Sequence, residues 1–259
     1  MTNHYVHSQR NGDIVRLTLA RPERHNALVP ELLDDLLAAL KQCHQAPPRV
    51  IVLAAKGRSF SSGGDVRAFF DTPREERSAY ARKVVGKLND VILAMLEAPA
   101  PIVSAVQGLV TGGSLGLVLG SDIVIASHKA SFAPWYTVVG FSPDGGWSKL
   151  MGQRIGASRA LEIQLTNRTL TATQAHDYGL AHYLVEPEAL EKQVQTICQN
   201  LCAKQPESVL STLRLNRPDR SEAAISLQRE YEAFEAQIQT DEADNGMRNF
   251  LGQSSQKIS

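Results

Sequence analysis

The order of apolar and polar residues along the chain predicts strands that alternate with helices. Apolar residues recur at helical spacing over residues 27–44, where Asn26 is the expected N-cap, and again over residues 75–97. Short apolar or alternating runs around these two helices are typical of strands. The predicted strands cover residues 14–19, 50–54, 102–106 and 123–126. Strands and helices in alternation indicate an α/β fold.

The pattern changes after about Pro187. Ala, Glu, Gln and Leu dominate the rest of the chain, and turn signals occur at Pro206 and Pro218. This composition predicts helices and no further sheet. We therefore expect a core over residues 1–195 that carries the functional site, and a helical region over residues 196–259 that serves packing or oligomerisation.

Composition limits the classes of partner. The chain has 259 residues, 43% of them hydrophobic, which is enough for one large domain with a buried core. Its 27 basic and 27 acidic residues cancel, which argues against nucleic acid and favours a small molecule. The polar start, the three unpatterned cysteines and the absence of a long apolar run predict a cytoplasmic protein without a membrane partner. Cys198 and Cys202 are expected to pack a helix, and no residue pattern predicts a metal.

The most informative segment covers residues 107–116, which contain four glycines and follow a predicted strand. Glycines let the backbone approach a ligand closely with its N–H groups available. A helix beginning here would also direct the positive end of its dipole toward negative charge. The segment therefore predicts a site that stabilises an oxyanion.

Six segments follow one another in a characteristic order. They are 21–28 (RPERHNAL), 60–66 (FSSGGDV), 107–113 (QGLVTGG), 121–123 (SDI), 143–146 (PDGG) and 165–180. Together they resemble the crotonase superfamily, also called the enoyl-CoA hydratase/isomerase family. The resemblance extends over roughly residues 12–187.

This resemblance implies a fold and a substrate class. The family fold is a spiral of β-β-α turns with a C-terminal helical region that builds a homotrimer or a dimer of trimers. Family substrates are acyl-CoA thioesters, so CoA enters as part of the substrate and no separate cofactor or metal is expected. By position, the N–H groups of Gly64 and Gly113 hold the thioester oxygen while an enolate forms. In other enzymes, loss of one such donor costs about 3 kcal/mol.

The same comparison shows which acids the chain lacks. Family hydratases carry two glutamates, and the matching positions here are Gly116 and Tyr136. Hydration needs an activated water and a proton donor, so we do not expect hydratase activity. Asp144 stands where related isomerases carry their working aspartate, and an apolar setting would raise its pKa. We predict double-bond or ring isomerisation with Asp144 moving the proton, although Asp144 is also a candidate helix N-cap.

Further residues are expected to hold the substrate. Phosphates need cationic donors, and the family's CoA-lining segment matches residues 64–67. Aromatic residues are candidate walls of the acyl pocket. Surface charge and core packing are the alternatives for these residues. The expected set is Arg24, Ala27, Gly63, Asp65, Val66, Arg67, Phe69, Trp135 and Tyr136.

Three other functions stay open. Parts of the chain resemble chlorobenzoyl-CoA dehalogenase, whose nucleophilic aspartate would fall at Asp144 and whose histidine base would fall at Asn89. Ser114 matches a serine-hydrolase elbow with His176 or His182 as base, although an elbow serine directly follows its strand and Ser114 does not. The third alternative is a CoA-ester binder without catalysis.

Overall fold

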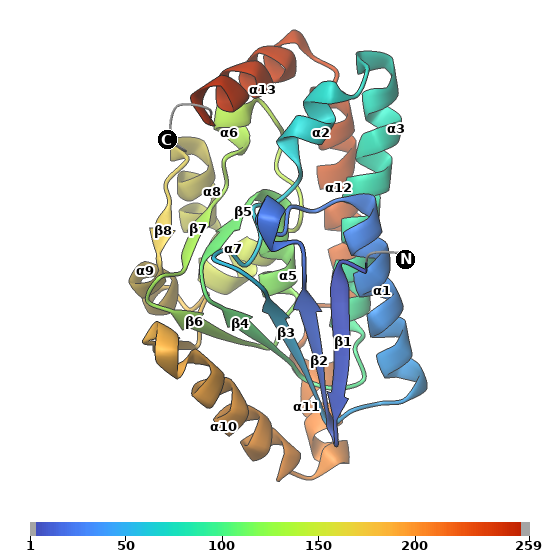
Figure 1. Ribbon diagram of the computed structural model, residues 1–259, viewed down its shortest axis with the longest axis vertical. Coiled ribbons are helices and arrows are strands. Elements are labelled where there is room, and N and C mark those ends of the chain that lie inside the picture. Colours follow the sequence, from blue (N-terminus) through green and yellow to red (C-terminus); the bar gives the residue numbers. More distant parts are fainter. Residues whose placement is uncertain (1–3, 255–259) are drawn as a thin grey trace.

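The computed structural model describes residues 4–254 of the chain. These residues fold into two β-sheets and a shell of helices (Figure 1). The larger sheet has the order β1-β2-β3-β4-β6-β9, in which only the β1–β2 pair is antiparallel. Its strands are β1 (Val6–Asn11), β2 (Ile14–Leu19), β3 (Val50–Ala55), β4 (Ile102–Val106), β6 (Ile123–Ser127) and β9 (Tyr183–Val185). The smaller sheet joins β5 (Leu109–Thr111), β7 (Ser131–Ala133) and β8 (Leu170–Thr171). The α/β prediction is confirmed.

Helices cover both sheets. In the first half of the chain they are α1 (Pro30–Gln45), α2 (Val66–Asp71), α3 (Arg77–Ala81), α4 (Lys87–Leu96) and α5 (Leu115–Leu119). Next come α6 (Tyr136–Val139), α7 (Leu150–Ile155), α8 (Ala157–Thr166), α9 (Ala172–Asp177), α10 (Leu190–Cys202), α11 (Pro206–Asn216), α12 (Arg220–Gln237) and α13 (Asp241–Ser254). Short 3-10 turns are η1 (Pro22–Arg24), η2 (Arg74–Glu76), η4 (Gly112–Ser114) and η5 (Pro187–Ala189), and η3 (Arg82–Gly86) is a π-helical turn. In the described residues, no helix is long and apolar enough to span a bilayer.

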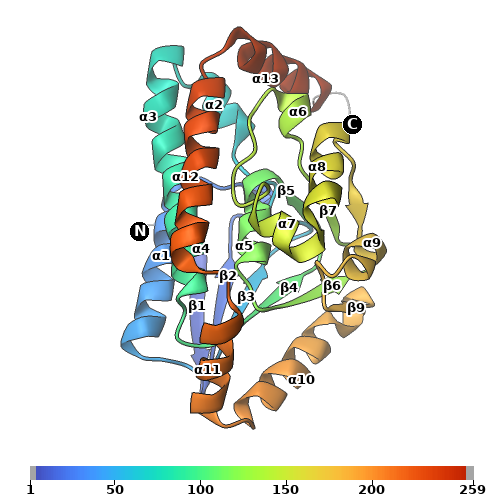
Figure 2. The ribbon, with the colours of Figure 1, turned by 180° about the vertical axis from the view of Figure 1, so that it is seen from behind.

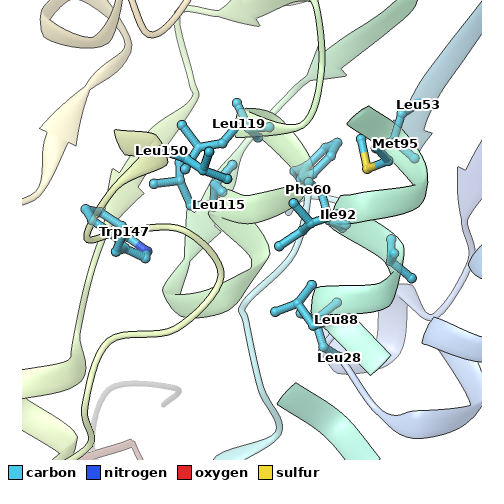
Figure 3. Packing of buried hydrophobic residues seen from close by; sticks show 14 of the residues in the cluster. Leu28, Leu53, Phe60, Leu88, Ile92, Met95, Leu115, Leu119, Trp147 and Leu150 are labelled. Atoms are coloured by element: carbon cyan, nitrogen blue, oxygen red, sulfur yellow. The ribbon is translucent and has the colours of Figure 1, made fainter. Parts of the chain in front are cut away.

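The central strands β3, β4 and β6 of the larger sheet are buried on both faces, which explains why they are almost wholly apolar. On one face, α10 packs against residues such as Val103 and Ile125, and Cys198 contributes to this contact as predicted. The other face joins the main core beneath α1 and α4. Within that core, Ile92 of α4 packs against Gly116 of α5, and Leu88 lies beside Leu28, as Figure 3 shows. This packing fixes α4 and α5 beside the residues that form the site.

The four predicted strands are confirmed to within one residue at each end, but one helix start was predicted wrongly. Asn26 is no N-cap: its φ is +53°, and its buried side chain accepts from the Arg21 amide and donates to the Lys56 and Ser59 carbonyls. Helix α1 begins at Pro30, because proline favours the first helical position. Asn26 therefore joins two loops instead of starting a helix.

The helix predicted over residues 75–97 is interrupted. Helices α3 and α4 enclose the π-helical turn η3, which ends at Gly86. Such a turn adds one residue without changing which residues are apolar, so apolar spacing alone does not reveal it.

The tail after residue 187 is helical, as predicted, but it is not separate from the core. Position 195 lies inside α10, and α12 runs along α3 and α4 (Figure 2). The guanidinium of Arg217 donates to both carboxylate oxygens of Asp122 at 2.8 Å and to the carbonyls of Ala98 and Ala100. Helix α13 covers α6, where a Cβ on Gly246 would lie 2.2 Å from the Val139 carbonyl oxygen. The tail therefore packs directly against the core through helices α12 and α13.

Candidate active site

The glycine-rich segment forms strand β5, the turn η4 and helix α5. A parallel bridge between Ser61 and Val110 holds this segment against the loop that follows β3. Gly112 has φ +52°, and Gly113 is the second residue of η4. The amide of Gly113 is thus among the first N–H groups of a helical segment, which have no acceptor within that segment.

Gly64 lies in the adjoining loop. The bridge that joins it to Leu28 uses the Gly63 carbonyl and the Asp65 amide, so the amide of Gly64 takes no part in it. A Cβ on Gly63 would lie 2.5 Å from the Thr111 carbonyl oxygen. This close approach requires glycine and brings the Gly64 loop against the segment that carries Gly113.

Asp144 reaches Gly113 from a third segment, the loop between α6 and α7. A Cβ on Gly113 would stand 2.7 Å from Asp144 Oδ1 and 3.0 Å from Oδ2, so the carboxyl group lies directly over Gly113. Gly145 has φ +67°, and a Cβ there would meet the Gly113 carbonyl oxygen at 2.5 Å. The indole N–H of Trp147 donates to the Gly112 carbonyl at 2.8 Å. The Asp144 loop is therefore fixed to the glycine segment.

Asp144 is buried, and within residues 4–254 one side chain donates to its carboxyl group. The Tyr136 hydroxyl donates to Asp144 Oδ1 at 2.5 Å and lies 3.0 Å from the Asp144 carbonyl oxygen. Burial raises the pKa of Asp144 to about 7, while the Tyr136 hydrogen bond lowers it and the Glu230 carboxylate raises it. Burial, followed by the charge of Asp144, raises the pKa of Tyr136 well above its ordinary value. Asp144 can therefore gain or lose a proton near neutral pH. Residues 145–149 form turns, so Asp144 caps no helix.

Glu230 comes from α12, within the tail. Its carboxylate accepts from the Gly146 amide at 2.7 Å and the Ser148 amide at 2.8 Å, and also from the Ser148 hydroxyl. Burial raises the pKa of Glu230, and these donors oppose that rise. The tail thus fixes the loop that carries Asp144, a role that the sequence did not indicate.

An apolar pocket opens between these segments. Phe69, Phe141 and Phe234 form one wall, with ring centroids 5.2–5.7 Å apart. Of the predicted site residues, the structure places seven in the lining, namely Gly64, Val66, Phe69, Gly113, Trp135, Tyr136 and Asp144. The pocket therefore joins both predicted amides, the predicted acid and the predicted aromatic walls.

The other five predicted site residues lie outside the lining of this pocket. Asp65 accepts from the Ala68 amide as N-cap of α2 and pairs with Arg21 and Arg24. Ala27 and Gly63 are buried in the loops behind the pocket. Arg24 is half exposed, and Arg67 is exposed on α2. The guanidinium groups of these two residues are accessible to an anionic group that lies outside the apolar pocket.

The position of Gly116 is closed to a larger residue. A Cβ there would stand 2.4 Å from Ile92 Cδ1 and 2.6 Å from the Gly145 carbonyl oxygen. Because one obstacle is backbone, a small side-chain movement does not make room. The structure thus leaves no space for the acid that the resemblance assigns to this position in hydratases.

Gly116→Glu is therefore expected to destabilise the fold by about 1–3 kcal/mol and to create no hydratase. Urea denaturation and a crotonyl-CoA hydration assay measure the two effects. Gly86→Ala is the matched control, because a Cβ at Gly86 meets nothing within 4 Å. A Gly116→Glu protein that hydrates crotonyl-CoA and keeps its stability would contradict this account.

The structure gives no support to two of the alternative functions. The Ser114 hydroxyl donates to the Ser61 and Thr111 carbonyls, and no hydrogen bond in the described residues joins it to a histidine. Asn89, at the position of the dehalogenase base, donates from Nδ2 to the Leu227 carbonyl and lies outside the pocket lining. Ser114 therefore has no histidine partner among the described residues, and the position of the dehalogenase's histidine base holds an amide that cannot take a proton.

The fold and the sequence agree with known proteins. A profile described as enoyl-CoA hydratase/isomerase matches residues 9–257. The 1,2-epoxyphenylacetyl-CoA isomerase of Escherichia coli (strain K12) is 29% identical over 233 residues, covering 88% of each chain. A 4-chlorobenzoyl coenzyme A dehalogenase-2 of Arthrobacter sp. is 28% identical over 203 residues, covering 78% of this chain and 74% of that protein. The crystal structure of enoyl-CoA hydratase from Bacillus halodurans has TM-score 0.89 at 26% identity, covering 95% of this chain and 99% of that chain.

The chain belongs to the enoyl-CoA hydratase/isomerase family, whose enzymes act on acyl-CoA substrates. The predicted crotonase fold and the similarity to the dehalogenase are confirmed. The three relatives carry the names of an isomerase, a dehalogenase and a hydratase. Family membership therefore defines the substrate class, and the choice of reaction depends on the residues in the pocket.

Proposed function

We propose that this protein is an acyl-CoA isomerase in which Asp144 moves a proton between two carbons of an enolate. One observation carries the proposal: Asp144 is the only acid lining the pocket in residues 4–254, and it lies directly over Gly113. Its pKa, raised by burial to about 7, suits both removal and return of a proton at neutral pH.

In this reaction the Asp144 carboxylate takes a proton from a carbon conjugated with the thioester. The electron pair of the broken C–H bond moves into the carbonyl, and the negative charge collects on the thioester oxygen. The N–H groups of Gly64 and Gly113 donate to that oxygen, and their fixed positions stabilise the enolate. Protonated Asp144 then gives the proton to a different carbon. The double bond moves, and no water is added.

The remaining predicted residues receive roles that follow from their places. Val66, Phe69, Trp135 and Tyr136 enclose the acyl group in the apolar pocket. Arg24 and Arg67, outside it, would meet the phosphates of CoA, because arginine binds phosphate well in an exposed position. Assembly as a homotrimer or a dimer of trimers is part of the same proposal and rests on the resemblance to the crotonase superfamily.

A panel of enoyl-CoA and aryl-CoA esters incubated in deuterated water tests the reaction. We expect deuterium to enter at least one ester, with movement of its double bond and no net hydration. Halide release from a chlorinated aryl ester would instead favour dehalogenase chemistry. Binding of an acyl-CoA without any exchange would favour the non-catalytic binder, and crotonyl-CoA hydration at the rate of a dedicated hydratase would overturn the proposal.

A further inference from the structure

We propose that Tyr136 and Glu230 are positioning residues that act on Asp144 in opposite directions and together set the pH range in which it works. Tyr136 belongs to α6 and Glu230 to α12, so the two groups approach Asp144 from different parts of the chain. The kinetic consequence rests on the proposed function, but the effect on Asp144 itself does not.

Tyr136 determines which oxygen of Asp144 is available to the substrate. Its buried hydroxyl donates to Oδ1, and within residues 4–254 no side chain donates to Oδ2; the other hydrogen bond to this carboxylate comes from the backbone of Asp144 itself. The edge of the Tyr136 ring packs on Trp147, with centroids 6.3 Å apart and planes at 84°, which limits rotation of the tyrosine. Oδ2 is therefore left to exchange the proton, while Oδ1 stays bound to the protein.

Glu230 determines where the Asp144 loop lies. Its two oxygens receive hydrogen bonds from the Gly146 amide, the Ser148 amide and the Ser148 hydroxyl. Three donors facing one buried carboxylate favour its ionised form. Because these donors lie two and four residues beyond Asp144, Glu230 fixes the loop without touching the carboxyl group that works on the substrate.

The two residues also oppose each other electrostatically. A hydrogen bond from Tyr136 stabilises ionised Asp144, whereas the negative charge of Glu230 disfavours a second negative charge nearby. Within the described residues, these are the titratable groups that act on Asp144. Tyr136→Phe is therefore expected to raise the pKa of Asp144, and Glu230→Gln to lower it.

Two measurements on the full-length protein test this inference. The first is ¹³C NMR titration of Asp144 in protein labelled at aspartate side-chain carboxyls, without substrate, with the Asp144 signal assigned by its loss in Asp144→Asn. The second is the pH profile of deuterium exchange on the best ester of the panel. We expect each midpoint to rise by about one pH unit in Tyr136→Phe and to fall by a similar amount in Glu230→Gln.

Tyr231→Phe and Glu232→Gln are the matched controls, because both lie on α12 outside the pocket lining and change the same chemical groups. In both control variants, Asp144 should titrate with the same midpoint as in wild type. Unchanged midpoints in Tyr136→Phe and Glu230→Gln, or shifts in one common direction, would overturn the inference. If wild type exchanges no proton but the NMR midpoints move as expected, the proposed reaction fails while the control of Asp144 stands.

Discussion

Asp144→Asn is expected to lower the rate of deuterium exchange by about 10²–10⁴-fold, the usual contribution of a positioned acid or base. The amide has nearly the size of the carboxyl group, and its oxygen still accepts from Tyr136, so the pocket keeps its shape. The amide group of asparagine, however, cannot take a proton from carbon. Mass spectrometry measures the exchange, and calorimetry measures the binding of acyl-CoA. Together they separate a loss of catalysis from a loss of binding.

Asp90→Asn is the control, because Asp90 is exposed on α4 and outside the pocket lining. It should leave exchange unchanged. In wild type the rate should rise with pH as Asp144 ionises, with its midpoint at about pH 7, and level off at higher pH. If Asp144→Asn kept the wild-type rate and pH profile, another group would have to move the proton.

Asp144→Asn is also expected to change how the free energy of unfolding depends on pH. Folding raises the pKa of Asp144 from 3.8 to about 7, so the unfolded chain loses this proton first as the pH rises. Between pH 4 and 7, ionisation therefore favours the unfolded chain, and above 7 the difference is constant. Urea denaturation should show that Asp144→Asn gains stability relative to wild type from pH 5 to pH 8. A stability difference that did not change with pH would contradict the raised pKa.

The sequence predicted the centre of the site because that centre is built from short contiguous segments. Gly64, Gly113 and Asp144 each lie in a run whose residues recur together in the family, and all three line one pocket. Backbone N–H groups are also insensitive to the identity of nearby side chains, so glycine positions alone were enough to predict two candidate donors that line the same pocket. Strands β3, β4 and β6 were predictable because burial on both faces leaves a plain apolar run, and β2 was predictable from its alternation. Strand β1, whose residues after Val6 are exposed, gave no such signal and was not predicted.

The supporting residues could not be predicted in this way. Glu230 lies 84 residues beyond Gly146, and an isolated glutamate on a polar helix gives no local signal of burial. Trp147 lies three residues after Asp144, but the hydrogen bond from its indole to the Gly112 carbonyl depends on the fold. Asn26 fits an N-cap pattern, yet its side chain donates to the carbonyls of Lys56 and Ser59 in a distant loop, which gives it a different role. In each case a contact between distant segments decided the outcome.

Gly113→Ala is expected to reduce exchange by about 10²-fold or more, although alanine keeps the backbone N–H. Its Cβ would stand 2.7 Å from Asp144 Oδ1 and 2.8 Å from Leu88 Cδ2, so the carboxyl group must move. A displacement of about 1 Å is enough for a loss of this size, because proton transfer needs a close and directed approach.

Gly64→Ala is the matched substitution at the other proposed donor. Its Cβ would meet only Phe69 Cε2, at 3.3 Å, and that ring can yield by a few tenths of an ångström. We therefore expect a clearly smaller loss of exchange than in Gly113→Ala, with both proteins folded by circular dichroism. Equal losses would mean that crowding of the acyl group, and not displacement of Asp144, limits both variants. Wild-type exchange in Gly113→Ala would show that the contact between Gly113 and Asp144 is not needed for proton transfer.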